Sequence, residues 1–203
     1  MQQMNCQNCG ASLEIENQFI RAVTCPACGT SYLVRGSDNL DMTGKTASLA
    51  DYPSRLSVGA QGKIKGRGFT VLGRIRYMYD AGFWEEWQIG WDDGAPPDWL
   101  EEDEGMWTLY RRGRVKAEIP PYEQVRVGAT MPINNEQVFI TEKRTAQVMG
   151  SVGQFSSVFP IQGTFGYATG AANNRSVSVN YWEDEIELSI GEDLEYNDLV
   201  IQS

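Results

Sequence analysis

The sequence predicts an all-β protein with a small N-terminal zinc ribbon, and three observations lead to this fold class. All four cysteines lie in the first 28 residues of the 203-residue chain. From Leu56 onward, apolar and polar residues alternate with the period of two that β-strands require. No segment of a dozen residues shows the apolar stripe of a helix. We therefore expect a metal-stabilised module followed by a β-domain of small barrel or sandwich type.

The cysteines form two C-x2-C pairs, each followed by glycine, and this pattern predicts a tetrahedral zinc site. The pairs are Cys6 with Cys9 in CQNCG and Cys25 with Cys28 in CPACG. A C-x2-C turn directs two thiolates to one point, and the following glycine permits the backbone to fold back toward the sulfurs. Between the pairs there is room for a short hairpin of SLEIE with FIRAVT. One zinc ion held by four cysteines has no ligand position left for water, so it would be structural.

The sequence leaves two alternatives to a zinc site, namely two disulfides or a redox-active cysteine pair of the thioredoxin kind. Disulfides are unfavourable in a chain that shows no secretion signal. The redox motif is typical of a βαβ setting, which the strand pattern does not offer. We therefore expect residues 1–35 to be a zinc ribbon whose folding depends on the metal.

The rest of the chain is predicted to be a linker, 36–54, and a β-domain, 55–203. The linker segment is polar and has no sustained period, so it is either a free linker or a loop lying along the next domain. Residues 56–75 resemble residues 125–144 at an offset of 69, which makes two related units, 55–120 and 121–203, an alternative to one undivided domain. Beyond the hairpin discussed next, the predicted strands are 106–112, 114–119, 137–143, 175–182 and 186–190.

Residues 69–91 are predicted to form an antiparallel hairpin with a three-residue loop at 80–82, in which Gly82 has positive φ. This register places Ile75 opposite Trp87, Arg76 opposite Glu86, and Arg74 opposite Gln88. Trp87 would then be a core residue, whereas Trp84 would lie on the outer face. The inward face of the hairpin would be made of Phe69, Val71, Ile75, Tyr77, Tyr79, Trp87, Ile89 and Trp91.

The charge distribution points to an acidic surface. The chain carries 17 basic and 27 acidic residues, so nucleic acid is an unfavourable partner. Residues 80–104 hold ten acids and residues 183–198 hold eight, with no base in either segment. These acids either form a solvated face that keeps the protein soluble or attract a polyamine or a Lys/Arg-rich protein segment. The candidate surface is an exposed turn and its neighbours: Trp99, Glu101, Glu102, Asp103, Glu104 and Trp107.

Catalysis and membrane insertion are both unfavourable on the composition. The chain contains no histidine, which removes the commonest general base and the His-dependent triads. It has no phosphate-binding glycine loop and no G-x-S-x-G motif. Carboxylates are abundant, so a carboxylate-dependent hydrolase stays a less favoured alternative. With no run of about 18 apolar residues and no secretion signal, the chain is expected to be cytoplasmic.

Several segments together resemble a bacterial family, domain of unknown function 4178. They are CQNCG, CPACG, LSVGAQGKIKGRGFTVLGRIRY, WEEWQI, WLEEDEGMWTL and IELSIGEDLEYNDLVI, and the resemblance covers almost the whole chain. It implies no assigned enzymatic activity. It also implies a gene neighbourhood of polyamine-synthase-like enzymes, small membrane proteins and stress-associated membrane proteins.

Residues and resemblance together favour a non-catalytic bacterial adaptor, in which a zinc ribbon is joined to a β-domain that binds a protein partner. The resemblance extends the range of partners to membrane-associated proteins. The alternative is a sensor that binds a polyamine or another cation on its acidic surface.

Overall fold

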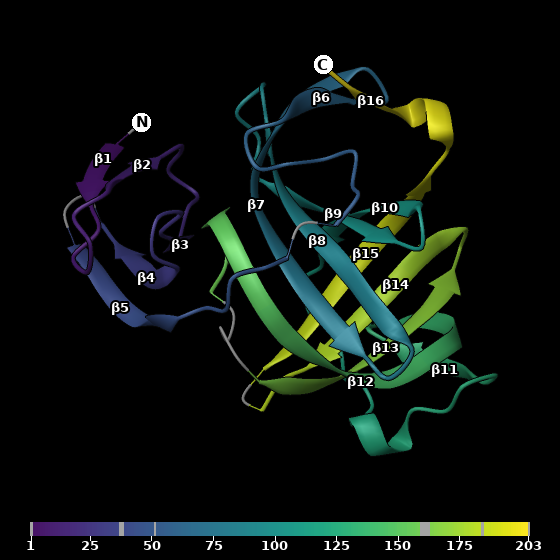
Figure 1. The fold of residues 1–203 in the computed structure, drawn as a ribbon. Helices are drawn as coiled ribbons and strands as arrows, with labels where there is room; N and C mark the ends of the chain where they lie inside the picture. Colours follow the sequence, from purple (N-terminus) through teal and green to yellow (C-terminus); the bar gives the residue numbers. More distant parts are fainter. Residues whose placement is uncertain (1, 37–38, 51, 159–162, 184, 203) are drawn as a thin grey trace.

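Figure 1 shows the fold in a computed structural model, which describes residues 2–36, 39–50, 52–158, 163–183 and 185–202. The N-terminal unit has five strands: β1 (Gln2–Asn5), β2 (Ser12–Ile15), β3 (Ala22–Thr24), β4 (Thr30–Arg35) and β5 (Asn39–Lys45). The expected pairing of SLEIE with FIRAVT is wrong, because β2 pairs with β1 and β3 pairs with β4. Each C-x2-C turn reverses the chain by itself, so each cysteine pair lies in the turn of its own hairpin.

Eight antiparallel strands after the N-terminal unit close into a barrel. They are β7 (Arg67–Tyr79), β8 (Gly82–Trp91), β9 (Asp98–Asp103), β10 (Met106–Arg112), β12 (Glu136–Phe155), β13 (Thr164–Ala172), β14 (Arg175–Tyr181) and β15 (Ile186–Leu194). Their order is β7-β8-β9-β10-β15-β14-β13-β12, and pairing of β12 with β7 closes the ring. The far end of β12 also pairs with β3, which joins the N-terminal unit to the barrel (Figure 1). The all-β class and the small barrel are thus confirmed.

The two halves of the barrel begin with matching hairpins, as the internal repeat predicts. β6 (Gln61–Ile64) precedes β7, and β11 (Thr130–Ile133) precedes β12 at the same offset of 69 residues. Gly59 N donates to Val71 O at 2.8 Å, and Gly128 N donates to Ile140 O at 2.9 Å. The 55–120 and 121–203 segments are therefore related in structure. They do not form separate barrels, because each contributes four strands to one ring.

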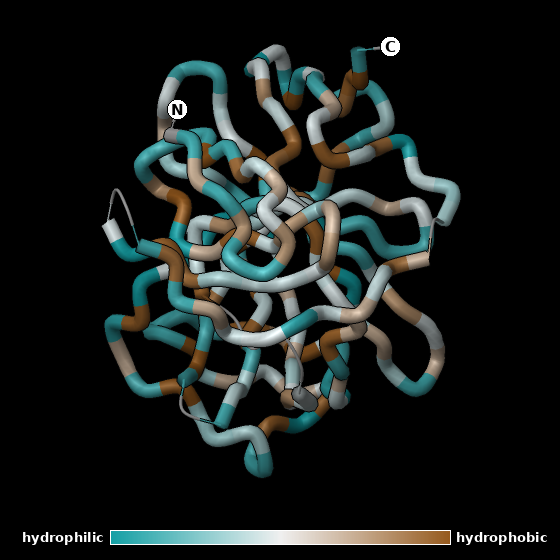
Figure 2. The backbone as a smooth tube through the Cα atoms, turned by 60° about the vertical axis from the view of Figure 1, so that its left-hand side comes forward, coloured by the Kyte–Doolittle hydropathy of each residue, from teal (hydrophilic) through white to brown (hydrophobic). Residues whose placement is uncertain are grey.

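Four apolar cores result from this arrangement within the described residues: one inside the barrel, one outside each half, and one in the N-terminal unit, to which Leu72 of β7 contributes. The inner core includes Ile75, Trp84, Trp99 and Phe165. The hairpin of β6 and the C-terminal β16 (Leu199–Ile201) cover the first outer core, and β11 covers the second. The remaining elements are short 3-10 helices, η1 (Tyr122–Gln124) and η2 (Tyr196–Asp198). Hydrophobic and hydrophilic positions accordingly alternate along the tube in Figure 2.

The 69–91 hairpin exists, but its predicted register and loop are wrong. A two-residue turn, 80–81, joins the strands, Gly82 is not among the residues with positive φ, and Arg74 rather than Ile75 is opposite Trp87. A bulge at Leu72 inserts one extra residue and exchanges the two faces of β7. Ile75 therefore faces the barrel interior, whereas Val71 packs in the outer core.

Tryptophans on both faces of β8 are buried. Trp87 is fully buried in the outer core, as predicted. Trp84, which we expected on the outer face, is only 7% exposed and packs inside the barrel against Tyr77 and Tyr167. Both faces of this strand are covered by protein, so the alternation of its residues does not distinguish a solvent-exposed face from a buried one.

Two further segments differ from the sequence prediction. The 36–54 segment, expected to be a linker or a loop along the next domain, contains β5 and then runs along the barrel, where Thr46 Oγ1 donates to Ser151 O at 3.2 Å. Residues 114–119, predicted as a strand, form a loop because their backbone groups bond to the Asn134 side chain instead of a neighbouring strand.

Candidate functional site

The four cysteine sulfurs converge on one point in the N-terminal unit. All four Sγ atoms lie within 4.8 Å of one another. The Cys6 and Cys28 sulfurs are 3.6 Å apart, and the Cys9 and Cys25 sulfurs are 3.7 Å apart. Zn–S bonds of about 2.3 Å in a tetrahedron require S···S distances of about 3.8 Å. The sulfurs are therefore spaced for a metal ion with four thiolate ligands.

Both cysteine turns have the same backbone, and the predicted role of the glycines is confirmed. Gly10 and Gly29 have φ of 77° and 72°, which a residue with a side chain rarely adopts. Gly10 N donates to Cys6 O at 2.8 Å, and Gly29 N donates to Cys25 O at 2.9 Å. Each glycine thus closes the turn that brings its two sulfurs together.

Neighbouring polar groups favour the thiolate form at part of the cluster. Hydrogen bonding to the Asn8 side chain, together with Thr30, lowers the pKa of Cys28 to about 5. The Tyr32 hydroxyl lies 3.2 Å from Cys6 Sγ and accepts a hydrogen bond from Asn8 N at 3.1 Å. Tyr32 is fully buried, so it fixes the first cysteine turn to the sheet. These groups stabilise negative charge on sulfur, which metal binding requires.

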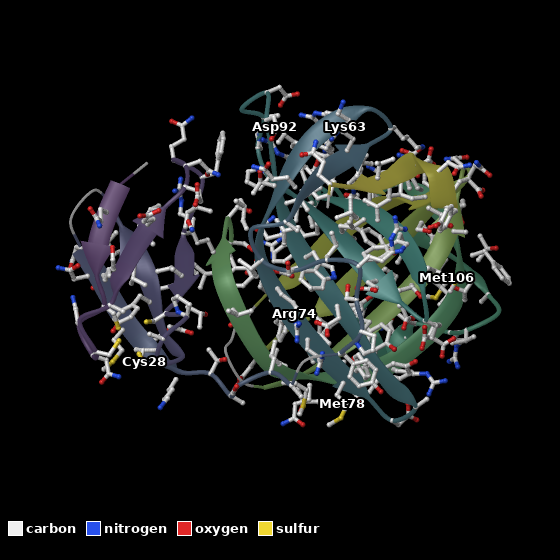
Figure 3. The ribbon with its side chains drawn as sticks, turned by 45° about the horizontal axis from the view of Figure 1, so that its top comes forward. Cys28, Lys63, Arg74, Met78, Asp92 and Met106 are labelled. Carbon is white, nitrogen blue, oxygen red and sulfur yellow. The ribbon has the colours of Figure 1, made fainter. Side chains whose placement is uncertain are left out.

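The geometry does not support the disulfide alternative, because all four cysteines are free thiols. In Figure 3, Cys28 lies at the lower edge of the N-terminal unit, and Met106 lies beyond the barrel on the other side of the molecule. The cysteine cluster is therefore separate from the acidic region that contains Met106.

The predicted acidic surface is divided by the fold. Glu101, Glu102 and Asp103 belong to β9 rather than to an exposed turn, and only Glu104 lies in the turn that follows. The two tryptophans are each 8% exposed: Trp99 packs in the barrel interior and Trp107 in the first outer core. The expectation of an exposed turn beside these indoles is therefore wrong. Asp184, in the second acidic segment, lies outside the described residues.

Alternation along β9 gives its acids different tasks. Glu102 points outward, where its Oε2 accepts hydrogen bonds from Ser54 Oγ at 2.6 Å and from Trp87 Nε1 at 3.1 Å. Glu101 points into the barrel, opposite Glu86 of β8. Glu102 therefore holds the fold together, whereas Glu101 is available for other contacts.

A groove of about 730 Å³ lies where β9 and β10 meet the end of β15. Its walls include Glu101, Glu102, Asp103, Trp107 and Asp193, and they also include segment 53–55. Met106 and Tyr196 in the same wall are 66% and 79% exposed. Four of the six predicted surface residues thus line one groove, together with two exposed apolar side chains.

The sequence did not predict the second acidic site, which is inside the barrel. Burial, followed by the charges of other acids, raises the pKa of Glu101 to about 8. Burial also raises the pKa of Glu86 to about 7. The only sequence signal was that Glu86 shares a strand face with Trp84 in W-E-E-W-Q. Alternation alone does not show whether that face lies in a barrel interior or in solvent.

The fold and the cysteine cluster define a class of protein: a closed eight-stranded β-barrel joined to a small unit that carries four cysteines spaced for a metal ion. The chain belongs to the family described as a domain of unknown function, DUF4178, whose model matches residues 57–196. The match covers the barrel and leaves out the cysteine unit. No curated protein and no solved structure matches the chain. Among the described residues, no helix has the length and hydrophobicity needed to cross a membrane.

Proposed function

We propose that the protein is a non-catalytic bacterial interaction protein that binds a Lys/Arg-rich segment of a partner protein in the groove between β9, β10 and β15. The observation that carries this proposal is the combination of acidic walls with exposed Met106 and Tyr196. Acidic groups attract the basic segment over a distance, and exposed apolar side chains bury area once it has docked. The groove would then act as the recognition surface.

The basic residue in the groove wall, Arg55, does not neutralise these acids. Its guanidinium lies 5.2 Å from the Tyr196 ring, and its Nη2 donates to Leu199 O at 3.2 Å. Asp193 accepts hydrogen bonds from Thr108 and Ser176, which are uncharged. The negative potential of the groove is therefore left for a partner to compensate.

Zinc is the metal we propose for the cysteine cluster. Four thiolates at tetrahedral spacing suit zinc, and a closed ligand set gives it a structural role. Zinc would hold β1–β5 in shape beside the barrel, so that an adaptor could present two separated surfaces. Four reduced cysteines also favour a reducing compartment, and we propose the cytoplasm.

A carboxylate-dependent hydrolase has less support than a binding function. Glu86 and Glu101 are neighbours on one wall of the barrel, because they face each other across the β8–β9 ladder. Glycosidases instead place two carboxyl groups on either side of the bond to be cleaved. The lack of histidine removes the usual alternative base.

Calorimetry with a Lys/Arg-rich peptide tests the groove. Replacing Asp193 and Tyr196, which both line the groove, by Asn and Ala should weaken peptide binding at least about tenfold at low salt. The control replaces Glu118 and Glu123, which lie away from the groove, by Gln. Undiminished binding by the groove variant would refute the proposal. Heat from spermidine but not from the peptide would favour the cation-sensor alternative in the same groove.

A further inference from the structure

The interior of the barrel contains a cavity that meets the protein-binding groove at Glu101, Asp103 and Thr108 and extends from there into the barrel. Its volume is about 200 Å³, and a smaller space of about 30 Å³ adjoins it. Both spaces are lined by Glu86, Glu101, Tyr110, Ser178 and Asn180, so the two glutamates lie where the spaces meet. Asp103 and Tyr79 also line the larger cavity, and both are close to the 80–81 and 104–105 turns. The cavity therefore extends toward that end of the barrel.

The acids of this cavity lack the partners that buried acids normally have. Among the described residues, the Glu101 carboxylate has no hydrogen bond and no ion pair, although burial is the largest influence on its pKa. Asp103 Oδ1 is shielded from solvent and has no hydrogen-bond partner. Glu86 Oε1 accepts a long hydrogen bond of 3.4 Å from Trp84 Nε1, and the Tyr77 hydroxyl is a second hydrogen-bond partner of this carboxyl group. Buried polar groups without partners are uncommon in native proteins and imply that something else satisfies them.

The nearby basic side chains are committed to other acids. Arg112 is paired with Glu187. Arg144 Nε is 2.8 Å from Glu142 Oε1, and the Arg144 guanidinium is also paired with Asp80. Among the described residues, no basic side chain forms an ion pair with Glu86, Glu101 or Asp103, although the charge of Arg112 also acts on Glu86.

Four aromatic side chains share the remaining wall with six small hydroxyl or amide side chains. Tyr79, Trp84, Tyr110 and Tyr167 line the cavity, and Ser178 and Asn180 offer further hydrogen bonds. Aromatic faces attract cations and also accommodate methylene groups. A cavity of about 150 Å³ holds benzene, so this one holds a ligand of roughly six to nine non-hydrogen atoms.

We propose that the barrel binds a small alkylammonium ion in this cavity, with the ammonium group between Glu86 and Glu101 and the alkyl chain against the aromatic wall. The site shares Glu101 with the groove of the proposed function, but the rest of its contacts are its own, since Glu86, Trp84 and Tyr167 do not line that groove. A primary amine is protonated at neutral pH. It supplies a positive charge that compensates the two carboxylates, and its alkyl chain can pack against the aromatic rings.

The electrostatics of the barrel interior give this proposal a signature in pH. The charged and titratable groups around the two glutamates are Tyr77, Tyr79, Asp103, Tyr110, Arg112, Glu142, Arg144, Tyr167, Glu187 and Asp193. Burial and neighbouring acids raise the pKa of Glu86 and of Glu101. An ammonium ion binds best when both are ionised, so its affinity should increase with pH until the amine itself loses its proton near pH 10. Binding near pH 7 should release protons.

Calorimetry of the full chain at about pH 8.5, with pentylamine, diaminopentane and pentanol, tests the proposal. At least one amine should bind at least about tenfold more tightly than pentanol, which has the same alkyl chain without the charge. Glu86→Gln should remove this preference, and Glu123→Gln should not. Equal affinity for amine and alcohol, or no binding of either amine, would overturn the proposal.

A second variant separates loss of the site from loss of the fold. Ser178→Leu keeps both glutamates and fills the cavity, so it should abolish amine binding while peptide binding in the groove persists. Circular dichroism should show that both variants keep the wild-type strand content. Amine binding that survives Glu86→Gln and Ser178→Leu but is lost in the groove variant would place the amine in the groove and refute the interior site.

Discussion

The carboxyl group of Glu101 should destabilise the folded protein at neutral and basic pH, and Glu101→Gln removes that burden. The folded state raises the pKa of this group from 4.5 to about 8. Between these values the folded chain binds a proton that the unfolded chain has released. Stability therefore decreases as pH rises through this window, and it levels off above the folded pKa.

The size of the effect follows from the same values. One pKa unit corresponds to about 1.36 kcal/mol, so the penalty would be about 3 kcal/mol at pH 7 and more at pH 9. Water in the cavity and proton sharing with Glu86 reduce it. We expect Glu101→Gln to gain at least about 1 kcal/mol over wild type between pH 6 and pH 9.

Urea unfolding followed by tryptophan fluorescence at several pH values measures this gain. The amide that Glu101→Gln introduces has its own free-energy cost, which is the same at every pH. The test is therefore how the difference in unfolding free energy between variant and wild type changes with pH, and not its absolute value. Exposed Glu118 supplies the control variant, Glu118→Gln, whose stability should stay parallel to that of wild type. A constant difference between Glu101→Gln and wild type across this range would refute the account of a destabilising interior carboxylate.

Three further predictions concern the metal site, the inner core and a buried ion triad. The purified protein should contain one zinc per chain, and Cys25→Ser should make the N-terminal unit sensitive to proteolysis while barrel fluorescence persists, since all six tryptophans lie beyond residue 80. Trp84→Ala should cost about 3 to 5 kcal/mol in urea unfolding, in contrast to the tolerance expected of an outer-face residue. Glu85→Gln should cost about 3 kcal/mol in the same assay, because it leaves Arg74 and Arg76 without their shared buried partner; a cost near zero would mean that the triad is dispensable.

The metal-binding unit could be predicted because its signal is local. Four sulfurs and two glycines at fixed spacing specify both turns, and the structure brings Cys6, Cys9, Cys25 and Cys28 together. What spacing does not specify is which strands pair between the turns. The internal repeat was also readable, since the offset of 69 residues recurs in the hydrogen bonds of Gly59 and Gly128.

The face of each barrel strand could not be predicted from alternation, for two physical reasons. First, the hairpins of β6 and β11 cover the outside of the barrel, so residues on both faces of β8 are buried. Second, the single extra residue at Leu72 reverses the parity of β7. Trp84 and Glu86 therefore looked like an exposed outer face although they line the barrel interior.

The arrangement of interior acids indicates that folding alone does not require them. The two halves of the barrel begin with matching hairpins, yet Glu86, Glu101 and Asp103, which form no ion pair among the described residues, all come from strands of the first half. The interior acids of the second half, Glu142 and Glu187, are each paired with an arginine. The β14 strand of the second half lines the same cavity with Ser178 and Asn180, which are neutral. A barrel wall can thus be built here without carboxylates. Because burial makes each carboxylate costly, a stable barrel is better served by neutral groups, and the proposed ammonium ion would supply the compensating charge.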